Sequence, residues 1–422
     1  MTWLDPLPVT GPAVEKRPSI PLGFRAGAVA AGIKPSGRPD LGVLATLGEA
    51  ASAAAVFTTS ALAAAPVRLS RAHLVATGGR AAAILATSGC ANAVTGPEGD
   101  ADQAALAAVL GGALGIEPEL TLALSTGLIG TRLPVDGLRR PLVDLVGRLE
   151  ATDASLAAVA QQICTTDSRP KTASVEIRVA GDRPNPITIS GIAKGVGMIH
   201  PEMATMLAVI MTDAPVAPAT LRQLLLPIVE RTWNQLTVDG DTSTNDTVFL
   251  LASGAAGGAV IEPGFEDLVR LSDGIEAVAR SLARQQAADG EGATMLLTCQ
   301  VSGARDDREA RAVARSIAGS SLVKAAAHGH DPNWGRIAAA IGATRLDGQP
   351  VPIVEHALAI AIGGIPVFHG MPVPIDRALL TAVLSSPEVT IRVDLGLGTG
   401  TGEAFGCDLS PEYVIENSAY ST

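Results

Sequence analysis

Residues 194–207 read Lys-Gly-Val-Gly-Met-Ile-His-Pro-Glu-Met-Ala-Thr-Met-Leu, a glycine-spaced turn that runs into an Ala-Thr step beside an apolar segment. Gly195 and Gly197 let the backbone approach itself closely, and Pro201 restricts the chain just before the step. Strand-like residues follow at once, so the Ala204–Thr205 step lies inside a folded unit. A cut at this step would therefore leave two interleaved chains and not two domains.

The Ala204–Thr205 step, in its glycine-spaced context, looks like a self-cleavage site. Threonine is a poor nucleophile at neutral pH, and the nearest base is its own α-amine once the preceding peptide bond is cut. An N-to-O acyl shift and ester hydrolysis would free that amine, whose unperturbed pKa is about 7.7–8.0. By composition alone, residues 203–211 are more typical of a buried strand or helix. Self-cleavage is therefore a hypothesis that depends on the rest of the chain.

Composition limits the class of protein. At 422 residues the chain exceeds a usual single core, which predicts two lobes or one large layered domain. Hydrophobic residues make up 47% and aromatic residues only 3%, so small and aliphatic side chains must fill the core. The net charge of −11 argues against a nucleic-acid or anionic-membrane partner.

Cysteine spacing and the N-terminal residues bear on the compartment. The four cysteines are far apart and form no CxxC pair, which favours reduced thiols over disulfides or a zinc site. The first ten residues lack the basic and apolar regions of a signal peptide, and no apolar run reaches transmembrane length. We therefore expect a cytoplasmic protein.

Short strand-like runs alternate with amphipathic helical runs, which favours an α/β or α+β layered protein. The predicted strands are residues 42–46, 53–58, 82–87, 120–125, 173–179, 187–192, 247–252, 294–301 and 389–394. The predicted helices are residues 101–114, 135–149, 155–163, 219–233, 265–288 and 308–317. Residues 180–185 contain Gly and Pro, and predict a hairpin turn between two of the strands.

Several motifs carry both a chemical and a structural interpretation. The Thr126 hydroxyl and the Gly127 N–H, at the end of a strand, could stabilise an oxyanion, although a strand-ending turn is the commoner meaning. Lys194 either reaches water or faces an anionic ligand. Glu291, between two glycines, could bind a substrate amine or cap a turn.

Metal and nucleotide sites are disfavoured. Residues 239–247 resemble a calcium loop but lack its closing glutamate, so a hydrogen-bonded turn that supports a site is favoured. The pair His328 and His330 has no third ligand at useful spacing. The alternating glycines at 396–402 fail GxGxxG, and no P-loop motif occurs. We expect no metal and no resident cofactor.

Together these segments resemble the ornithine acetyltransferase family, the glutamate N-acetyltransferases of arginine biosynthesis, over nearly the whole chain. The blocks that carry the resemblance are residues 23–26, 30–34, 55–58, 125–127, 165–167, 194–207, 239–247, 289–292, 330–336 and 417–422. The resemblance implies an αββα-type sandwich that cleaves itself into an α chain, 1–204, and a β chain, 205–422. It also implies an assembly of two α and two β chains.

The same resemblance implies a ping-pong reaction. Thr205 would take acetyl from N-acetylornithine as an ester and pass it to glutamate, with Thr126 and Gly127 as the oxyanion hole. The implied substrate contacts are Thr165, Lys194, Thr205, Glu291, Asn417 and Thr422. Because the last two lie at the extreme C-terminus, their involvement predicts an ordered tail. Whether acetyl-CoA also serves as a donor is left open.

The chain departs from the family pattern in two places. Cys90 stands where the family commonly has asparagine, and His200 and Glu202 stand where smaller or amide residues are frequent. These changes leave substrate preference open. Two other classes of function also stay open: an N-terminal-threonine amidase or aminopeptidase, because water can replace the amine acceptor, and an uncleaved ligand-binding or structural relative.

Overall fold

The computed structural model describes residues 4–9, 11–179, 186–200 and 206–419. Ala204, Thr205 and Thr422 therefore lie outside the described residues, as does the hairpin turn predicted at 180–185. The strands on either side of that turn, β7 (Lys171–Ile177) and β8 (Ile187–Lys194), pair antiparallel. None of the described helices is long and apolar enough to cross a membrane.

A four-stranded sheet, in the order β1-β2-β5-β6, forms one inner layer of a sandwich. Its strands are β1 (Phe24–Val29), β2 (Leu41–Thr46), β5 (Ala83–Cys90) and β6 (Thr121–Leu128). Helices α2 (Gly96–Leu114) and α3 (Val135–Val146) contribute the apolar side chains that pack on its outer face. On α3 the buried residues Leu138, Leu142 and Leu145 recur at helical spacing, which gives the helix one apolar stripe.

A six-stranded sheet, in the order β4-β3-β10-β9-β8-β7, forms the second inner layer. Besides β7 and β8 it contains β3 (Ala51–Phe57), β4 (Arg80–Ala81), β9 (Leu207–Thr212) and β10 (Thr247–Ala252). Helices α5 (Pro218–Arg231) and α6 (Glu266–Ala287) share an apolar core with its outer face. Every residue of β9 and β10 is buried, as expected for central strands covered on both faces.

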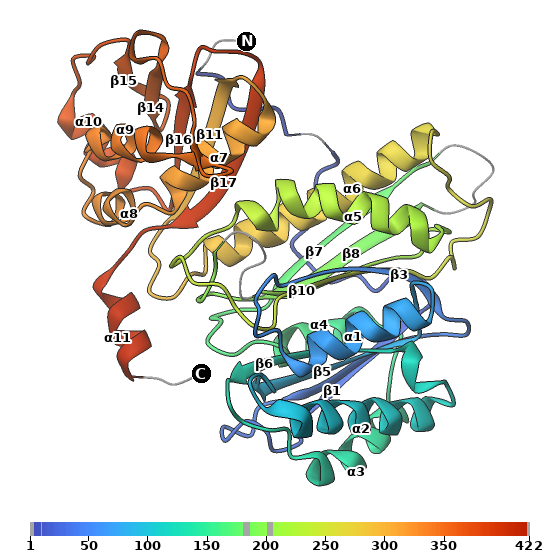
Figure 1. Cartoon of the computed structure of the whole chain (residues 1–422). Coiled ribbons are helices and arrows are strands. Elements are labelled where there is room, and N and C mark those ends of the chain that lie inside the picture. Colours follow the sequence, from blue (N-terminus) through green and yellow to red (C-terminus); the bar gives the residue numbers. More distant parts are fainter. Residues whose placement is uncertain (1–3, 10, 180–185, 201–205, 420–422) are drawn as a thin grey trace.

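The two sheets face each other across a shared apolar core, so the layers run helix, sheet, sheet, helix (Figure 1). Ile84 and Leu122 of the first sheet belong to the same buried cluster as Val209 and Phe249 of the second. Helix α4 (Asp153–Gln162) contacts strands of both sheets, while α1 (Ala65–Ala76) packs on β6 and α2. The predicted αββα-type layering is confirmed.

A second lobe follows the sandwich, built on a five-stranded sheet in the order β15-β14-β16-β11-β17 (Figure 1). Its strands are β11 (Leu296–Ala304), β14 (Ala359–Ile362), β15 (Ile365–His369), β16 (Glu388–Asp394) and β17 (Gly400–Cys407). Its helices are α7 (Asp307–Ala318), α8 (Ser321–His328), α9 (Trp334–Ala343) and α10 (Arg377–Leu384). Strands β12 (Arg345–Leu346) and β13 (Gln349–Pro350) pair separately, and α11 (Pro411–Ala419) follows the lobe.

All nine predicted strands and all six predicted helices occur at their expected places, with ends that differ by a few residues. The sequence analysis did not predict β1, α1, α8 to α11, or the strands β14, β15 and β17. The four cysteines are free and buried.

Candidate active site

The strand register fixes where the chain enters the second sheet after the proposed cleavage step. Leu207, the first residue of β9, pairs with Lys194, the last residue of β8. The Met206 N–H donates to Asp246 Oδ1 at 2.9 Å, and the Thr247 N–H donates to the Met206 carbonyl at 3.1 Å. The residues directly after Thr205 are therefore held beside Lys194.

Lys194 is buried and joins two of the other predicted site residues. Its Nζ donates to Thr165 Oγ1 at 2.9 Å and lies 3.3 Å from Thr126 Oγ1. Thr126 comes from β6 of the first sheet, Thr165 from the loop after α4, and Lys194 from β8 of the second sheet. The site thus lies where the two sheets meet at one end.

The backbone at Gly127 requires glycine. Its φ is +124°, and a Cβ at this position would lie 2.3 Å from the carbonyl carbon of Gly89 on the neighbouring strand. Asn245 fixes the same strand end, because its Nδ2 donates to the Ser125 carbonyl at 2.8 Å and to the Ala91 carbonyl at 2.7 Å. The proposed oxyanion pair therefore stands on rigid backbone.

Glu291 connects the sandwich to the C-terminal helix. Its Oε1 accepts from the Thr166 hydroxyl at 2.9 Å, and its Oε2 accepts from Asn417 Nδ2 at 2.9 Å. Its backbone N–H donates to the Val196 carbonyl at 2.8 Å. The C-terminal segment is helical as far as Ala419, while Thr422, the other tail residue of the prediction, lies outside the described residues.

One cavity brings these groups together, and it encloses about 90 Å³. Its described lining residues are Ala91, Thr126, Gly127, Ile129, Thr165, Thr166, Lys194, Gly197, Met198, Ser243, Thr244, Asn245, Glu291 and Asn417. Every predicted site residue that the structure describes is among them. A cation, a carboxylate, hydroxyls and an amide thus face one small space, which suits a zwitterionic ligand.

A buried charge network lies next to Lys194, and the sequence analysis did not predict it. Lys171 Nζ contacts Asp167 Oδ1 and Asp289 Oδ2, each at 2.5 Å, and Lys194 Nζ lies 3.8 Å from Asp167 Oδ2. Burial alone would raise the pKa of Asp167, but the two lysines and the Gly195 N–H hold that pKa below its ordinary value. The sequence signals were a lysine at the start of the apolar run that forms β7, and Asp167 and Asp289, which lie in two of the blocks that carry the resemblance.

The loop at 239–247 supports the site through hydrogen bonds. Asp239 accepts the N–H groups of Met198 and Ile199 at 2.6 and 2.8 Å. Asp246 accepts the Met206 N–H, and its burial raises the pKa of this carboxyl well above the ordinary value. Within the described ranges no three His, Cys, Asp or Glu side chains gather in a way that could hold a metal ion.

The other residues that the sequence singled out, His328, His330 and Cys90, are not among the described lining residues of the active-site cavity. His328 pairs with Asp408 at 2.8 Å in the second lobe, and His330 contacts Ser385 there. Cys90 sits on β5 next to Gly127, and its Sγ donates to the Thr131 carbonyl at 3.0 Å. Burial raises the pKa of this thiol, so the residue that departs from the family pattern is a neutral packing group.

This fold and cavity define a class of protein: a four-layer α/β enzyme whose site lies at the junction of the two inner sheets. The ArgJ family model matches residues 25–422. The arginine biosynthesis bifunctional proteins ArgJ of Thermosynechococcus vestitus and Thermus thermophilus are 46% and 45% identical over 417 and 403 residues. The alignments cover 95% and 96% of this chain, and 96% and 99% of those proteins.

Among solved structures, the protein of the same name from Bacillus halodurans is 41% identical, with a TM-score of 0.48. That match covers 50% of this chain and 98% of the other. The chain belongs to the ArgJ family. This confirms the resemblance described above and the expectation of an enzyme.

Proposed function

We propose that this protein moves an acetyl group from N-acetylornithine to glutamate through an ester on Thr205, after cleavage between Ala204 and Thr205. The observation that carries the proposal is the register that sets Leu207 beside Lys194, whose Nζ reaches both Thr126 and Thr165. Relatives about 45% identical over nearly the full chain are named as bifunctional proteins of arginine biosynthesis.

Self-cleavage forms the nucleophile. The Thr205 hydroxyl oxygen attacks the Ala204 carbonyl carbon, the C–N bond breaks, and an ester replaces the amide. Water then hydrolyses the ester, which leaves a carboxylate on Ala204 and a free amine on Thr205. The hydrogen bond from the Met206 N–H to Asp246 Oδ1 supports this step, because it fixes the backbone one residue after the threonine.

Acetyl transfer uses the hydroxyl oxygen and the amine nitrogen of Thr205. The amine takes the hydroxyl proton, and the oxygen attacks the acetyl carbonyl of the donor. Thr126 and Gly127 stabilise the oxyanion that develops, and the proton leaves with the ornithine amine. The amine of glutamate then attacks the ester, takes the acetyl group and restores the hydroxyl.

Substrate binding follows from the opposite charges in the cavity. Lys194, with the hydroxyl of Thr165, is placed to bind a substrate carboxylate, and Glu291 with Asn417 is placed to bind a substrate ammonium. Both substrates are amino acids that carry such groups. We extend the proposal to an assembly of two α and two β chains, without a resident cofactor and with acetyl-CoA as an additional donor.

An assay of labelled acetyl transfer tests the proposal. Protein incubated with acetyl-labelled N-acetylornithine and glutamate should place the label on glutamate, and Thr205→Ala should abolish this transfer. Label released as free acetate at the same rate with or without glutamate would identify a hydrolase. A Thr205→Ser variant, which keeps a hydroxyl nucleophile, should retain measurable transfer and serves as the matched control.

A further inference from the structure

A second and larger cavity lies between the sandwich and the second lobe. It has a volume of about 960 Å³. Its walls come from the end of α5 and the turn at Trp233–Gln235, from α7, and from the segment between α9 and β12. Small-molecule sites in proteins are typically about 300–1,000 Å³, so this cavity can hold a ligand of nucleotide size.

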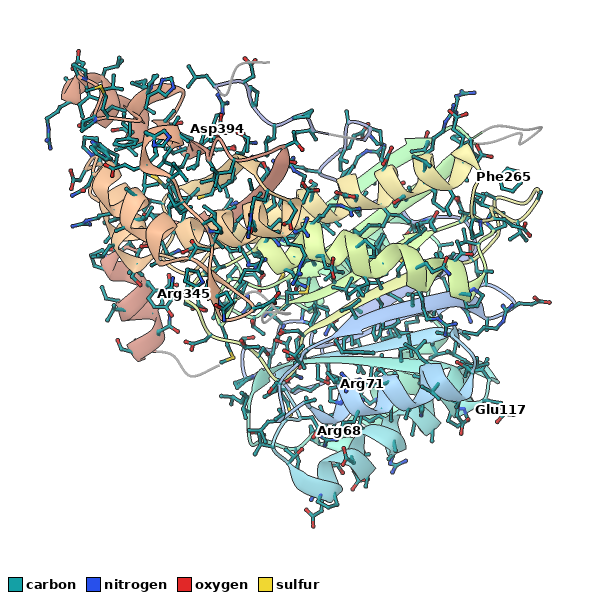
Figure 2. The ribbon with its side chains drawn as sticks, turned by 45° about the horizontal axis from the view of Figure 1, so that its top comes forward. Arg68, Arg71, Glu117, Phe265, Arg345 and Asp394 are labelled. Atoms are coloured by element: carbon teal, nitrogen blue, oxygen red, sulfur yellow. The ribbon has the colours of Figure 1, made fainter. Side chains whose placement is uncertain are left out.

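Four arginines line this cavity, in a chain whose net charge is −11. Arg308, Arg311 and Arg315 follow one another along α7 at intervals of three and four residues, so they share one helix face over roughly 10 Å. Arg345 adds a fourth guanidinium from β12, in the second lobe where it borders the sandwich (Figure 2). Only two carboxylates, Glu230 and Asp347, are among the described lining residues.

Two polar groups of the cavity wall lack a partner. The half-buried guanidinium of Arg311 forms no hydrogen bond or ion pair within the described part of the chain. Gln235 is only 1% exposed, and its Nε2 donates to the Glu230 carbonyl at 2.7 Å, while its Oε1 accepts nothing. The wall therefore offers positive donors to a ligand.

The cavity adjoins the active site through one loop. His200 and Thr242 belong to its lining, and Ser243 and Thr244, the next residues of the same loop, line the active-site cavity. Asp239 of this loop also holds the Met198 N–H at the active site. A ligand that contacts Thr242 would thus sit one residue from the groups that face the substrate.

We propose that this cavity binds an organic phosphate with two or more phosphate groups. Planar guanidinium forks match phosphate oxygens in pairs. Arg308 already pairs with Asp347 at 2.9 Å, so the forks offered to phosphates are those of Arg311 and the exposed Arg345. Recognition here depends on arginine side chains and not on a glycine-rich phosphate loop, which explains why no nucleotide motif appears in the sequence. The proposal is independent of the acetyl-transfer reaction.

Titration calorimetry on the full-length protein tests this site with pyrophosphate and ADP as probes. We expect both to bind. Arg311→Met and the exposed Arg345→Met should each weaken binding at least tenfold, with unchanged melting temperature for Arg345→Met. Arg140→Met, which alters an exposed arginine on α3 away from the cavity, should bind like the wild type.

Three results would overturn the proposal: no binding of either probe to the wild type, equal binding by Arg345→Met, or equally tight binding of succinate. The last result would show a general carboxylate site in place of a phosphate site. Because none of these readouts uses acetyl transfer, failure here leaves the proposed reaction untouched.

Discussion

The hydroxyl of Thr126 is the group that the proposed oxyanion stabilisation depends on most. Thr126→Val keeps the shape of the side chain and removes the donor, so we expect kcat for acetyl transfer to fall roughly 100- to 1,000-fold. Thr121→Val, on the same strand, is the matched control, because the Thr121 hydroxyl is buried and has no hydrogen-bond partner among the described residues. Equal kcat values for Thr126→Val and the wild type would remove Thr126 from the oxyanion hole.

Asp167 is the carboxylate that neutralises two buried lysines, Lys171 and Lys194. Asp167→Asn leaves both cations without this partner, so we expect the free energy of unfolding at pH 7 to fall by about 3–5 kcal/mol. Denaturant titration measures this difference. An exposed control, Asp136→Asn on α3, should change stability by less than about 1 kcal/mol.

The effect of Asp167 depends on pH in a definite direction. The lysines lower its pKa in the folded protein, so its stabilisation is present above the unfolded pKa of about 3.9 and is lost as pH falls through the folded value. The gap in unfolding free energy between the wild type and Asp167→Asn should therefore be constant near neutrality and narrow in acid. A gap that widens in acid would contradict the assigned charge state.

The sequence singled out groups that the structure brings together, but it predicted few of the residues that support them. Thr126, Thr165 and Lys194 meet because Thr126 and Lys194 lie near the ends of β6 and β8, and Thr165 lies in the loop between α4 and β7. Lys171 was not predicted, and Asp246 was predicted only as part of a supporting turn, because their partners lie 118 and 40 positions away. Periodicity and local motifs carry no information on such pairings.

At the scale of elements, the alternating glycines near the C-terminus have a packing role. A Cβ on Gly400 would lie 2.2 Å from the Asp306 carbonyl carbon, and one on Gly402 would lie 2.4 Å from the Arg311 nitrogen. Both glycines therefore let β17 lie directly against the start of α7. The sequence pattern excluded a nucleotide loop but could not show this close approach, which depends on tertiary packing.

Helix α11 supplies Asn417 to the active site from the far end of the chain. Asn417→Leu removes the amide that binds Glu291, so we expect KM for the amino-acid substrates to rise about tenfold, as for the loss of one charge-assisted hydrogen bond. Glu416→Gln, its exposed neighbour, is the control. Steady-state kinetics should show the change for Asn417→Leu only, with the melting temperatures of both variants near that of the wild type.

The elements that the sequence missed are mostly short or rich in small residues. α1 contains alanines and two β-branched valines over 12 residues without a clear apolar stripe. β14 and β15 are only 4 and 5 residues long, and β17 is interrupted by three glycines. Their strand pairing in the second lobe, and not local preference, makes them strands.

At the scale of the whole molecule, the proposed cleavage separates two chains that remain woven into one sheet. Across the second sheet, β4 and β3 precede residue 204, β10 and β9 follow it, and β8 and β7 precede it again. The two fragments should therefore elute together in native size-exclusion chromatography. With two of each chain, the mass by light scattering should be about twice the 42.7 kDa of one chain.

Fragments that separate without denaturant would contradict the interleaved arrangement. A mass of 42.7 kDa with both fragments present would keep that arrangement and exclude the assembly of two α and two β chains. The interleaved arrangement and the assembly of two α and two β chains can thus be contradicted separately.

Denaturing mass spectrometry of the protein mixed with N-acetylornithine tests the central claim most directly. We predict two fragments, residues 1–204 and 205–422, with the second heavier by one acetyl group and returned to its original mass by glutamate. Thr205→Ala should give one unmodified chain of 422 residues. An actively transferring wild-type preparation that consists of a single uncut chain, or one in which the acetyl group resides on the first fragment, would contradict the account.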